Sequence, residues 1–303
     1  MAQIVAEEFQ VDVDRIQITA TNTDKVPNTS PTAASSGADL NGKAAQNAAI
    51  TIKQRLIEFA SSHFKVTPEE VIFKNGMVQI REEIMTFADF AQLAWMNQIS
   101  LSSTGFYRTP KIYYDHEKAR GRPFYYFAYG ASCSEVIIDT LTGEYKILRV
   151  DILHDVGASL NPAIDIGQVE GGFVQGVGWL TTEELVWNEQ GRLMTNGPAS
   201  YKIPAIADMP IDFRTHLLEN RSNPEDTVFN SKAVGEPPFM LGMSVWSALK
   251  DAISYVAVDG AIPKLDTPAT PERVLMAVQA VTQGRKIQPL PQRKQTNKRG
   301  HYV

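Results

Sequence analysis

The residue best placed for acid–base chemistry is Glu236, which stands directly before Pro237 and Pro238. A proline disfavours helical geometry at the residue before it, so we expect Glu236 to be extended. The two prolines suit a first helical turn, where missing N–H groups cost nothing. A long apolar segment, 240–258, follows. Apolar surroundings would raise the pKa of the carboxyl group and make it a general base. The alternative is that Glu236 only complements a helix dipole.

A second candidate is a turn-rich segment of small and hydroxyl-bearing residues at positions 27–37. Small side chains let several backbone N–H groups approach one ligand, and the N-terminus of a following helix favours an anion. A phosphate-bearing cofactor would fit such a loop. The alternative is an ordinary loop before a helix capped by serine or threonine. The sequence holds no Walker motif and no GxGxxG, so a classical nucleotide site is not predicted.

Glycines recur four residues apart in the segment 167–178, which also holds Gln168 and Gln175. A glycine inside a helix costs about 1 kcal/mol relative to alanine. Either close packing or the close approach of a ligand must offset that cost, and we expect packing to explain the glycines. The five histidines show no metal-ligand spacing, and we interpret them as structural or surface residues. Cys133 is predicted to be buried and inert.

The elements that must position these candidates can be predicted from hydrophobic periodicity and turn residues. Hairpins mixed with helices indicate an α+β fold of mixed sheets with packed helices. The predicted elements are a strand at 16–19, a helix at 45–60, a hairpin around Asn75-Gly76, a helix at 87–93, strands at 124–139 and 144–153 joined at Thr142-Gly143, a helix near 167–176 and a buried helix at 240–258.

Composition bounds the class of protein. The chain has 303 residues, 43% of them hydrophobic, and a net charge of −5, so it can bury a core and nothing points to nucleic acid. A single cysteine excludes an internal disulfide framework and an iron–sulfur cluster, and it fits a reducing, cytoplasmic location. No apolar run approaches the roughly 20 residues of a membrane span, and the first residues do not read as a secretory signal.

We expect two subdomains and a tail. Residues 1–105 would form a first α+β subdomain with the cofactor loop, and residues 106–285 a second one with the catalytic glutamate. The boundary lies near 101–123, which is rich in Ser, Gly, Arg and Pro. Residues 286–303 are basic, without acids, and are predicted to be a flexible tail.

Taken together, the sequence resembles the molybdopterin-binding large subunit of the xanthine dehydrogenase/xanthine oxidase family, in its C-terminal part. The resemblance runs from about residue 4 to about residue 275, with its motifs in the family's order and at similar spacing. Four stretches carry it: 26–35 (VPNTSPTAAS), 104–110 (TGFYRTP), 159–171 (SLNPAIDIGQVEG) and 231–238 (SKAVGEPP).

The resemblance implies a mechanism for Glu236. The matching glutamate is the general base that takes a proton from a molybdenum-bound hydroxyl, which then attacks an electron-poor carbon of the substrate. Hydride passes to the molybdenum centre. Electrons leave through iron–sulfur clusters to FAD and then to NAD or oxygen, and both electron carriers lie outside this chain.

The resemblance also implies which residues bind the cofactor. The loop residues Thr32, Ala33, Ala34 and Ser35 would lie against molybdopterin, with the backbone of Ala34 closest to the metal. Gln168 matches a glutamine that contacts the cofactor. Gln175 is expected only to pack nearby.

The expected substrate is xanthine or hypoxanthine, oxidised to urate, because Pro237-Pro238 and the 105–110 stretch resemble the xanthine branch. An aldehyde or another N-heterocycle is the alternative substrate. The family's glycine- and glutamine-rich cofactor segment, and the arginine and glutamate that bind purine, have no counterpart here. The expected partners are therefore the upstream half of the molybdenum subunit and the iron–sulfur and FAD domains, in an oligomeric enzyme. By itself the chain could be a catalytically silent module.

Overall fold

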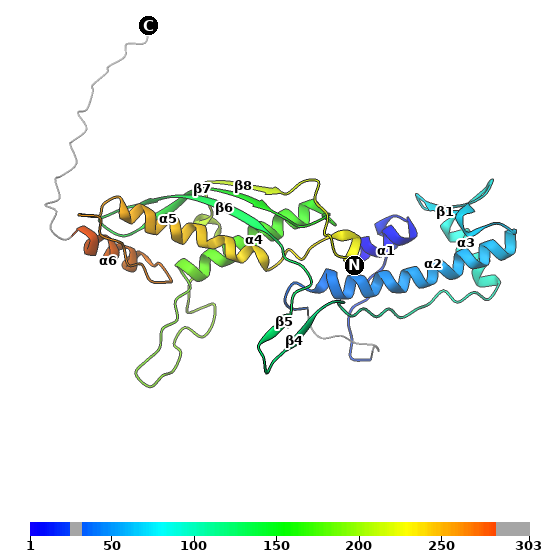
Figure 1. Ribbon diagram of the computed structural model, residues 1–303, viewed down its shortest axis with the longest axis horizontal. Coiled ribbons are helices and arrows are strands. Elements are labelled where there is room, and N and C mark those ends of the chain that lie inside the picture. The colour runs from blue at the N-terminus through cyan, green and yellow to red at the C-terminus, as the bar shows by residue number, and fades with distance from the viewer. Residues whose placement is uncertain (25–31, 283–303) are drawn as a thin grey trace, which may run out of the picture.

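The computed structural model describes residues 1–24 and 32–282 of an elongated molecule (Figure 1). The expected tail at 286–303 and the first part of the predicted loop lie outside the described residues. The helices are α1 (Ala2–Phe9), α2 (Lys43–Phe64), α3 (Phe87–Met96), α4 (Pro162–Thr181), α5 (Met243–Ser254) and α6 (Pro271–Thr282). The strands are β1 (Val71–Lys74), β2 (Met77–Ile80), β3 (Glu83–Thr86), β4 (Tyr113–Asp115), β5 (Arg120–Arg122), β6 (Gly130–Ile138), β7 (Tyr145–His154) and β8 (Asp212–Leu217).

The N-terminal part packs α2 and α3 against the antiparallel sheet β1-β2-β3. In α2, Leu56, Phe59 and Ala60 are buried at three- and four-residue steps, which is the amphipathic pattern that the sequence predicted. The β1–β2 turn places Asn75 and Gly76 at φ 50° and 74°. Both residues tolerate this left-handed geometry, so the predicted hairpin is confirmed.

The C-terminal part is built on the sheet β6-β7-β8, in which β7 pairs antiparallel with β6 and parallel with β8. Helices α4, α5 and α6 supply the other half of its core. Phe173 of α4, Val150 of β7 and Leu249 of α5 are fully buried there. This core fixes α4, whose remaining surface forms one wall of the candidate site.

Three predicted elements differ from the structure. Residues 16–19 form no strand; Ile18 is exposed, so its alternating pattern has no sheet against which to be buried. The segment 124–129 is irregular, and β6 begins only at Gly130. The helix predicted at 240–258 is a short 3-10 helix, Pro237–Gly242, followed by α5. One face of α5 is buried, and the other carries exposed residues such as Asp251. The prediction of a helix buried on both faces was therefore wrong.

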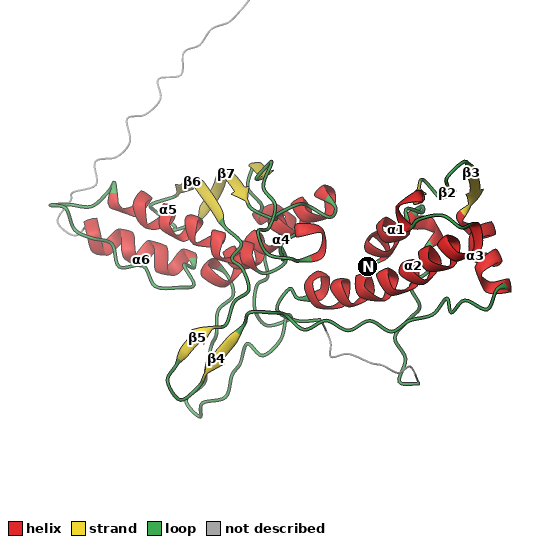
Figure 2. Ribbon diagram, turned by 45° about the vertical axis from the view of Figure 1, so that its right-hand side comes forward, coloured by secondary structure: helices red, strands yellow, loops and turns green. Residues whose placement is uncertain are grey.

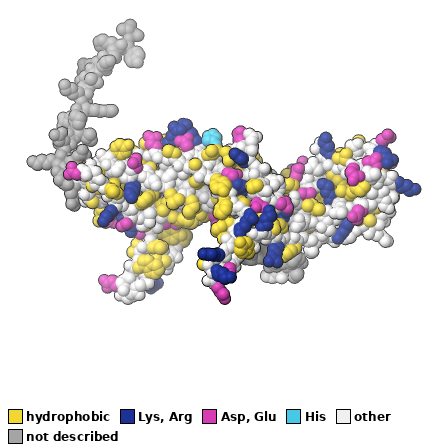
Figure 3. Space-filling model, in the orientation of Figure 1, with side chains coloured by type: hydrophobic (Ala, Val, Ile, Leu, Met, Phe, Trp, Pro, Cys, Tyr) yellow, Lys and Arg dark blue, Asp and Glu magenta, His cyan; other side chains and the backbone are white. Residues whose placement is uncertain are grey.

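Two segments project from the body of the molecule, and both point the same way in Figures 1 and 2. One is the β4–β5 hairpin. The other joins α4 to β8 and exposes Leu185, Trp187 and Met194. Figure 3 shows hydrophobic side chains gathered on this segment and on the adjoining body. Within residues 1–24 and 32–282, none of the helices is both long enough and apolar enough to cross a bilayer.

Among the residues that the structure describes, two clusters of buried apolar side chains are present. One is formed by residues between Leu56 and Ala94, and the other by residues between Ile147 and Val281. The division into subdomains 1–105 and 106–285 stays a prediction.

Candidate functional site

One cavity of 740 Å³ brings together every site residue that the sequence predicted. This volume falls within the range of about 300–1,000 Å³ that small-molecule sites occupy. Three chain segments form most of its walls: the loop after residue 31, the exposed side of α4, and the segment before the 3-10 helix Pro237–Gly242. Gln3 of α1 also lines it. The predicted residues that line it are Thr32, Ala33, Ala34, Ser35, Gln168 and Glu236.

The loop wall has an unusual backbone. Ala34 and Ser35 both lie in the left-handed region, at φ 54° and 53°. Residues with a Cβ pay roughly 1–2 kcal/mol for that geometry, so the loop must be held by other contacts. Ser36 supplies two of them, donating from its N–H (3.2 Å) and its hydroxyl (2.7 Å) to the carbonyl of Ala33. The backbone shape of the loop is therefore imposed by specific hydrogen bonds.

The helix-cap alternative for this loop is wrong. Ser36 precedes a π-helical turn, Gly37–Gly42, that leads into α2, and its side chain makes no capping hydrogen bond. Its hydroxyl points back to Ala33 instead, at 2.7 Å. The small residues at 32–35 thus serve the cavity wall and not the helix start.

Helix α4 presents one face to the cavity. Ile164, Gln168, Gly171 and Gln175 recur at helical spacing, and all four line the cavity. Gln175 was expected to be a packing residue, but its side chain is exposed in the cavity wall, because it follows Gln168 by seven residues on the same face. The helix starts at Asn161, whose side chain accepts from the N–H of Ile164 at 3.3 Å.

The glycines of α4 divide into two pairs. A Cβ on Gly172 or Gly176 would meet the carbonyl oxygen of Gly235 at 3.0 Å or that of Phe239 at 2.1 Å. Close packing therefore explains this pair, as predicted. A Cβ on Gly167 or Gly171 would meet nothing within 4 Å, so packing does not explain them. Gly171 lines the cavity and leaves its wall open to a ligand.

Glu236 is helical and not extended. Its φ and ψ are −95° and −34°, because its carbonyl accepts from the N–H of Phe239 at 2.9 Å and closes the first 3-10 turn. This bond outweighs the bias that Pro237 imposes. The side chain makes no capping hydrogen bond and is exposed, so this chain alone does not supply the apolar enclosure that we expected. Its backbone N–H donates to the hydroxyl oxygen of Ser35 at 2.7 Å.

A buried ion pair anchors the segment before Glu236, and no sequence signal predicted it. The ammonium of Lys232 lies 2.6 Å from Asp155, at the end of β7, and donates to the carbonyl of Phe127 at 3.0 Å. The backbone N–H of Lys232 also donates to the carbonyl of Val156 at 2.8 Å. Side-chain exposure is only 5% for the lysine and 10% for the aspartate. A buried charge must be paired, so this contact fixes where the segment begins.

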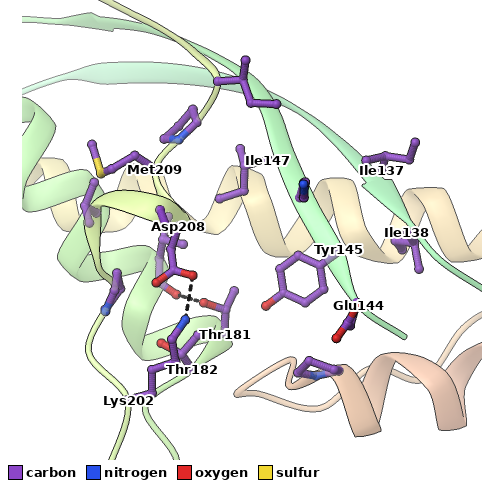
Figure 4. A pocket seen from close by; sticks show the side chains of 18 of the residues that line it. Ile137, Ile138, Glu144, Tyr145, Ile147, Thr181, Thr182, Lys202, Asp208 and Met209 are labelled. Carbon is purple, nitrogen blue, oxygen red and sulfur yellow. Dashed lines mark hydrogen bonds and ion pairs between the residues drawn. The ribbon is translucent and has the colours of Figure 1, made fainter. Parts of the chain in front are cut away.

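A second cavity, also of 740 Å³, lies between the β6–β7 hairpin, the end of α4 and residues 202–211 (Figure 4). None of the predicted site residues lines it. Two of its polar contacts are internal: Lys202 pairs with Asp208 at 2.6 Å, and the hydroxyl of Tyr145 donates to the carbonyl of Ala269 at 3.1 Å. The first cavity, with its convergent amide and hydroxyl groups, is the better candidate.

The first cavity fits an organic cofactor better than a directly bound metal ion. Among the described residues no group of three or more His, Cys, Asp or Glu could hold a metal. A metal here would take its ligands from an organic group. The open position at Gly171 and the neutral amides of Gln168 and Gln175 leave space and hydrogen-bonding groups for such a molecule.

Comparisons with known proteins show the family of the chain. Residues 1–210 match the model of the molybdopterin cofactor-binding domain. The chain is 47% identical to xanthine dehydrogenase/oxidase of Gallus gallus over 90% of its length and 19% of that protein. It is 45% identical to xanthine dehydrogenase of Oryza sativa subsp. japonica, over 91% of this chain and 20% of that one. The chain thus spans about a fifth of the length of these relatives.

Solved structures show the same fold. CO dehydrogenase from Oligotropha carboxidovorans matches with a TM-score of 0.74 and 23% identity, and quinoline 2-oxidoreductase from Pseudomonas putida 86 with 0.72 and 24%. Each match covers 92% of this chain and 34% of the other chain. The predicted α+β class is confirmed. The chain belongs to the molybdopterin cofactor-binding domain family and corresponds to the molybdopterin-binding region of xanthine dehydrogenase/oxidase.

Proposed function

We propose that this chain is the base-bearing part of a molybdenum hydroxylase that oxidises xanthine or hypoxanthine to urate. The observation that carries the proposal is the hydrogen bond from the N–H of Glu236 to the hydroxyl of Ser35, at 2.7 Å. It joins the candidate base to the candidate cofactor loop in one cavity. The names of the curated relatives supply the substrate class.

The cofactor would be held by the loop and by α4. Thr32, Ala33, Ala34 and Ser35 would lie against molybdopterin, with the backbone of Ala34 nearest to the metal, and Gln168 would donate or accept a hydrogen bond. When bound, the molybdenum cofactor supplies the two-electron oxidation. The left-handed backbone at Ala34 and Ser35 supports this role, because strained geometry of this kind gathers at ligand sites.

Glu236 would act on the proton. A carboxylate oxygen accepts the proton of the hydroxyl that adds to an electron-poor carbon of the purine. The side chain lines the cavity and is exposed in this chain. Closure of the cavity by the rest of the enzyme would exclude water from the carboxylate and make it a stronger base.

The remaining parts of the enzyme would lie outside this chain. The single cysteine cannot ligate an iron–sulfur cluster. Iron–sulfur and FAD domains or subunits, with the upstream half of the molybdenum subunit, are therefore the proposed partners in an oligomer. One cysteine in 303 residues also suits a reducing compartment, so we propose a cytoplasmic enzyme of purine catabolism.

The test is Glu236→Gln in the assembled enzyme. Loss of a general base should lower kcat by about 10²–10⁴-fold while the molybdenum-to-protein ratio stays unchanged. Glu170→Gln, on α4 but outside the cavity lining, is the matched control and should keep full activity. Turnover of Glu236→Gln within a few-fold of the wild-type rate would disprove the base assignment.

Two further measurements separate the alternatives. Comparing kcat/KM of the assembled enzyme for xanthine, an aldehyde and quinoline tests the purine against an aldehyde or N-heterocycle specificity. The molybdenum-to-protein ratio of this chain by itself, from elemental mass spectrometry, tests whether it is a silent module. A ratio near one means that the loop and α4 retain the cofactor alone, and a ratio near zero means that other segments are required.

A further inference from the structure

Tyr126 lies between the two loops that form the cavity. It belongs to the irregular segment between β5 and β6, and its hydroxyl is part-buried. The hydroxyl donates to a carboxylate oxygen of Asp39 and accepts from the backbone N–H of Ala233 at 2.7 Å. One side chain therefore contacts two segments that lie almost 200 positions apart in the chain.

Both partners of Tyr126 lie close to site residues. Asp39 stands four positions after Ser35, in the π-helical turn Gly37–Gly42, and Ala233 stands three positions before Glu236. The Ser35–Glu236 hydrogen bond joins the same two segments. The base segment thus contacts the loop segment at two points. In the contact through Tyr126, Ala233 lines the cavity, whereas Tyr126 and Asp39 do not.

The Tyr126 hydroxyl donates one hydrogen bond and accepts another, so a side chain without this group could make neither. Burial raises the pKa of Tyr126, so the group remains a hydroxyl that can donate and accept at the same time. The other carboxylate oxygen of Asp39 is buried and has no hydrogen-bond partner among the described residues. Without the hydroxyl, the N–H of Ala233 would lose its acceptor and the carboxyl group of Asp39 would lose its donor. A buried polar group without a hydrogen-bond partner lowers the stability of the folded state.

We propose that Tyr126 is a positioning residue, which holds the Glu236 segment against the cofactor loop through Asp39 and Ala233. The inference rests on the proposed role of Glu236. It acts on the orientation of the base and not on binding of the substrate. The expected signature is therefore a lower kcat per bound molybdenum with an unchanged KM.

The experiment uses Tyr126→Phe in the assembled enzyme. We expect kcat per bound molybdenum to fall by about 10-fold or more, with KM for xanthine within about 2-fold of wild type. Hydrogen–deuterium exchange of peptides covering 231–239 should rise, because the Ala233 N–H loses its acceptor. Tyr145→Phe is the matched control: it also removes a part-buried tyrosine hydroxyl with one backbone partner, but in the second cavity. It should leave both readouts unchanged.

A second pair of variants keeps the inference testable if Tyr126→Phe fails to fold. Asp39→Ala removes the acceptor and should raise exchange and lower kcat. Asp39→Asn keeps an oxygen acceptor at the same place and should restore both. Equal behaviour of Asp39→Ala and Asp39→Asn would contradict the inference, as would a Tyr126→Phe enzyme with wild-type kcat or with wild-type exchange.

The two variants Glu236→Gln and Tyr126→Phe distinguish failure of the Tyr126 role from failure of the proposed function. If Glu236→Gln retains turnover while Tyr126→Phe still raises exchange at 231–239, the tie exists but the base is another residue, and the positioning role falls with it. If Glu236→Gln is inactive while Tyr126→Phe changes neither kcat nor exchange, the base stands and the role of Tyr126 is disproved.

Discussion

The backbone N–H of Glu236 donates to the hydroxyl of Ser35 across 201 positions of chain. The contact is possible because Gly235 has no side chain: a Cβ there would lie 2.8 Å from the Ser35 hydroxyl oxygen and 3.4 Å from the Gln168 carboxamide oxygen. Gly235 is therefore the point where the loop, α4 and the base segment meet. Because Gly235 has no Cβ, the loop, α4 and the base segment can approach one another closely at this point.

The buried ion pair between Lys232 and Asp155 should dominate the stability of the base segment. Lys232→Met would leave the Asp155 carboxylate buried without its cation, which typically costs about 3–5 kcal/mol. Urea denaturation of the chain, followed by tryptophan fluorescence, would measure the loss in free energy of unfolding.

The matched control for that prediction is Lys202→Met. Lys202 lies at the same 2.6 Å from Asp208, but its side chain is 56% exposed. An exposed pair contributes at most about 1 kcal/mol, so this variant should lose little. Equal losses for the two lysines would show that burial does not decide the strength of the pair.

Gly171→Ala should separate folding from cofactor binding. The added methyl group meets nothing within 4 Å, and alanine favours a helix over glycine by about 1 kcal/mol, so the chain should become more stable. The same methyl group would project into the cavity. We therefore expect a lower molybdenum-to-protein ratio in the assembled enzyme, measured by elemental mass spectrometry.

Gly167→Ala is the control, since Gly167 lies on the same helix, has equally open space and does not line the cavity. It should raise stability to a similar extent and leave the molybdenum content unchanged. A normal molybdenum content in Gly171→Ala would mean that the cofactor does not approach this face of α4.

Asp39 should give the chain a definite dependence of stability on pH. Burial raises the pKa of its carboxyl group above the ordinary 3.8, and the hydrogen bond from Tyr126 opposes this only in part. Above pH 3.8 the unfolded chain releases this proton while the folded chain still holds it, so stability falls as pH rises through that interval. Asp39→Asn has no proton to release.

The measurement is the difference in free energy of unfolding between Asp39→Asn and wild type, taken from about pH 4 to about pH 8. The difference should grow in favour of the variant as pH rises and then level off. A difference that is constant over the range, or that shrinks, would show that the folded-state pKa of Asp39 is not raised.

Local signals predicted much of the fold. The periodicity of α2 and the Asn75-Gly76 turn lie where short-range rules place them, because each depends on neighbours within a few residues. The strand predicted at 16–19 fails because alternation indicates a strand only where a partner strand exists. The geometry of Glu236 was also predicted wrongly, since a hydrogen bond from Phe239 decides it.

The residues of the candidate site were predicted through the family resemblance, and the structure brings all of them to one cavity. The supporting groups could not be predicted. Lys232, Asp155, Tyr126 and Asp39 carry no motif, because their function depends on contacts between segments that are distant in the sequence. Cys133 was predicted to be buried, but it lies on an exposed position of β6.

The 201-residue separation between Ser35 and Glu236 sets an order of events during synthesis. The loop and α2 leave the ribosome early, whereas the segment that closes the cavity is translated only after α4, β7 and β8. Until then the left-handed loop lacks its hydrogen-bonded partner, and the cavity has no third wall. A cofactor that contacts the loop, α4 and the Glu236 segment together would therefore bind only after Glu236 has been synthesised.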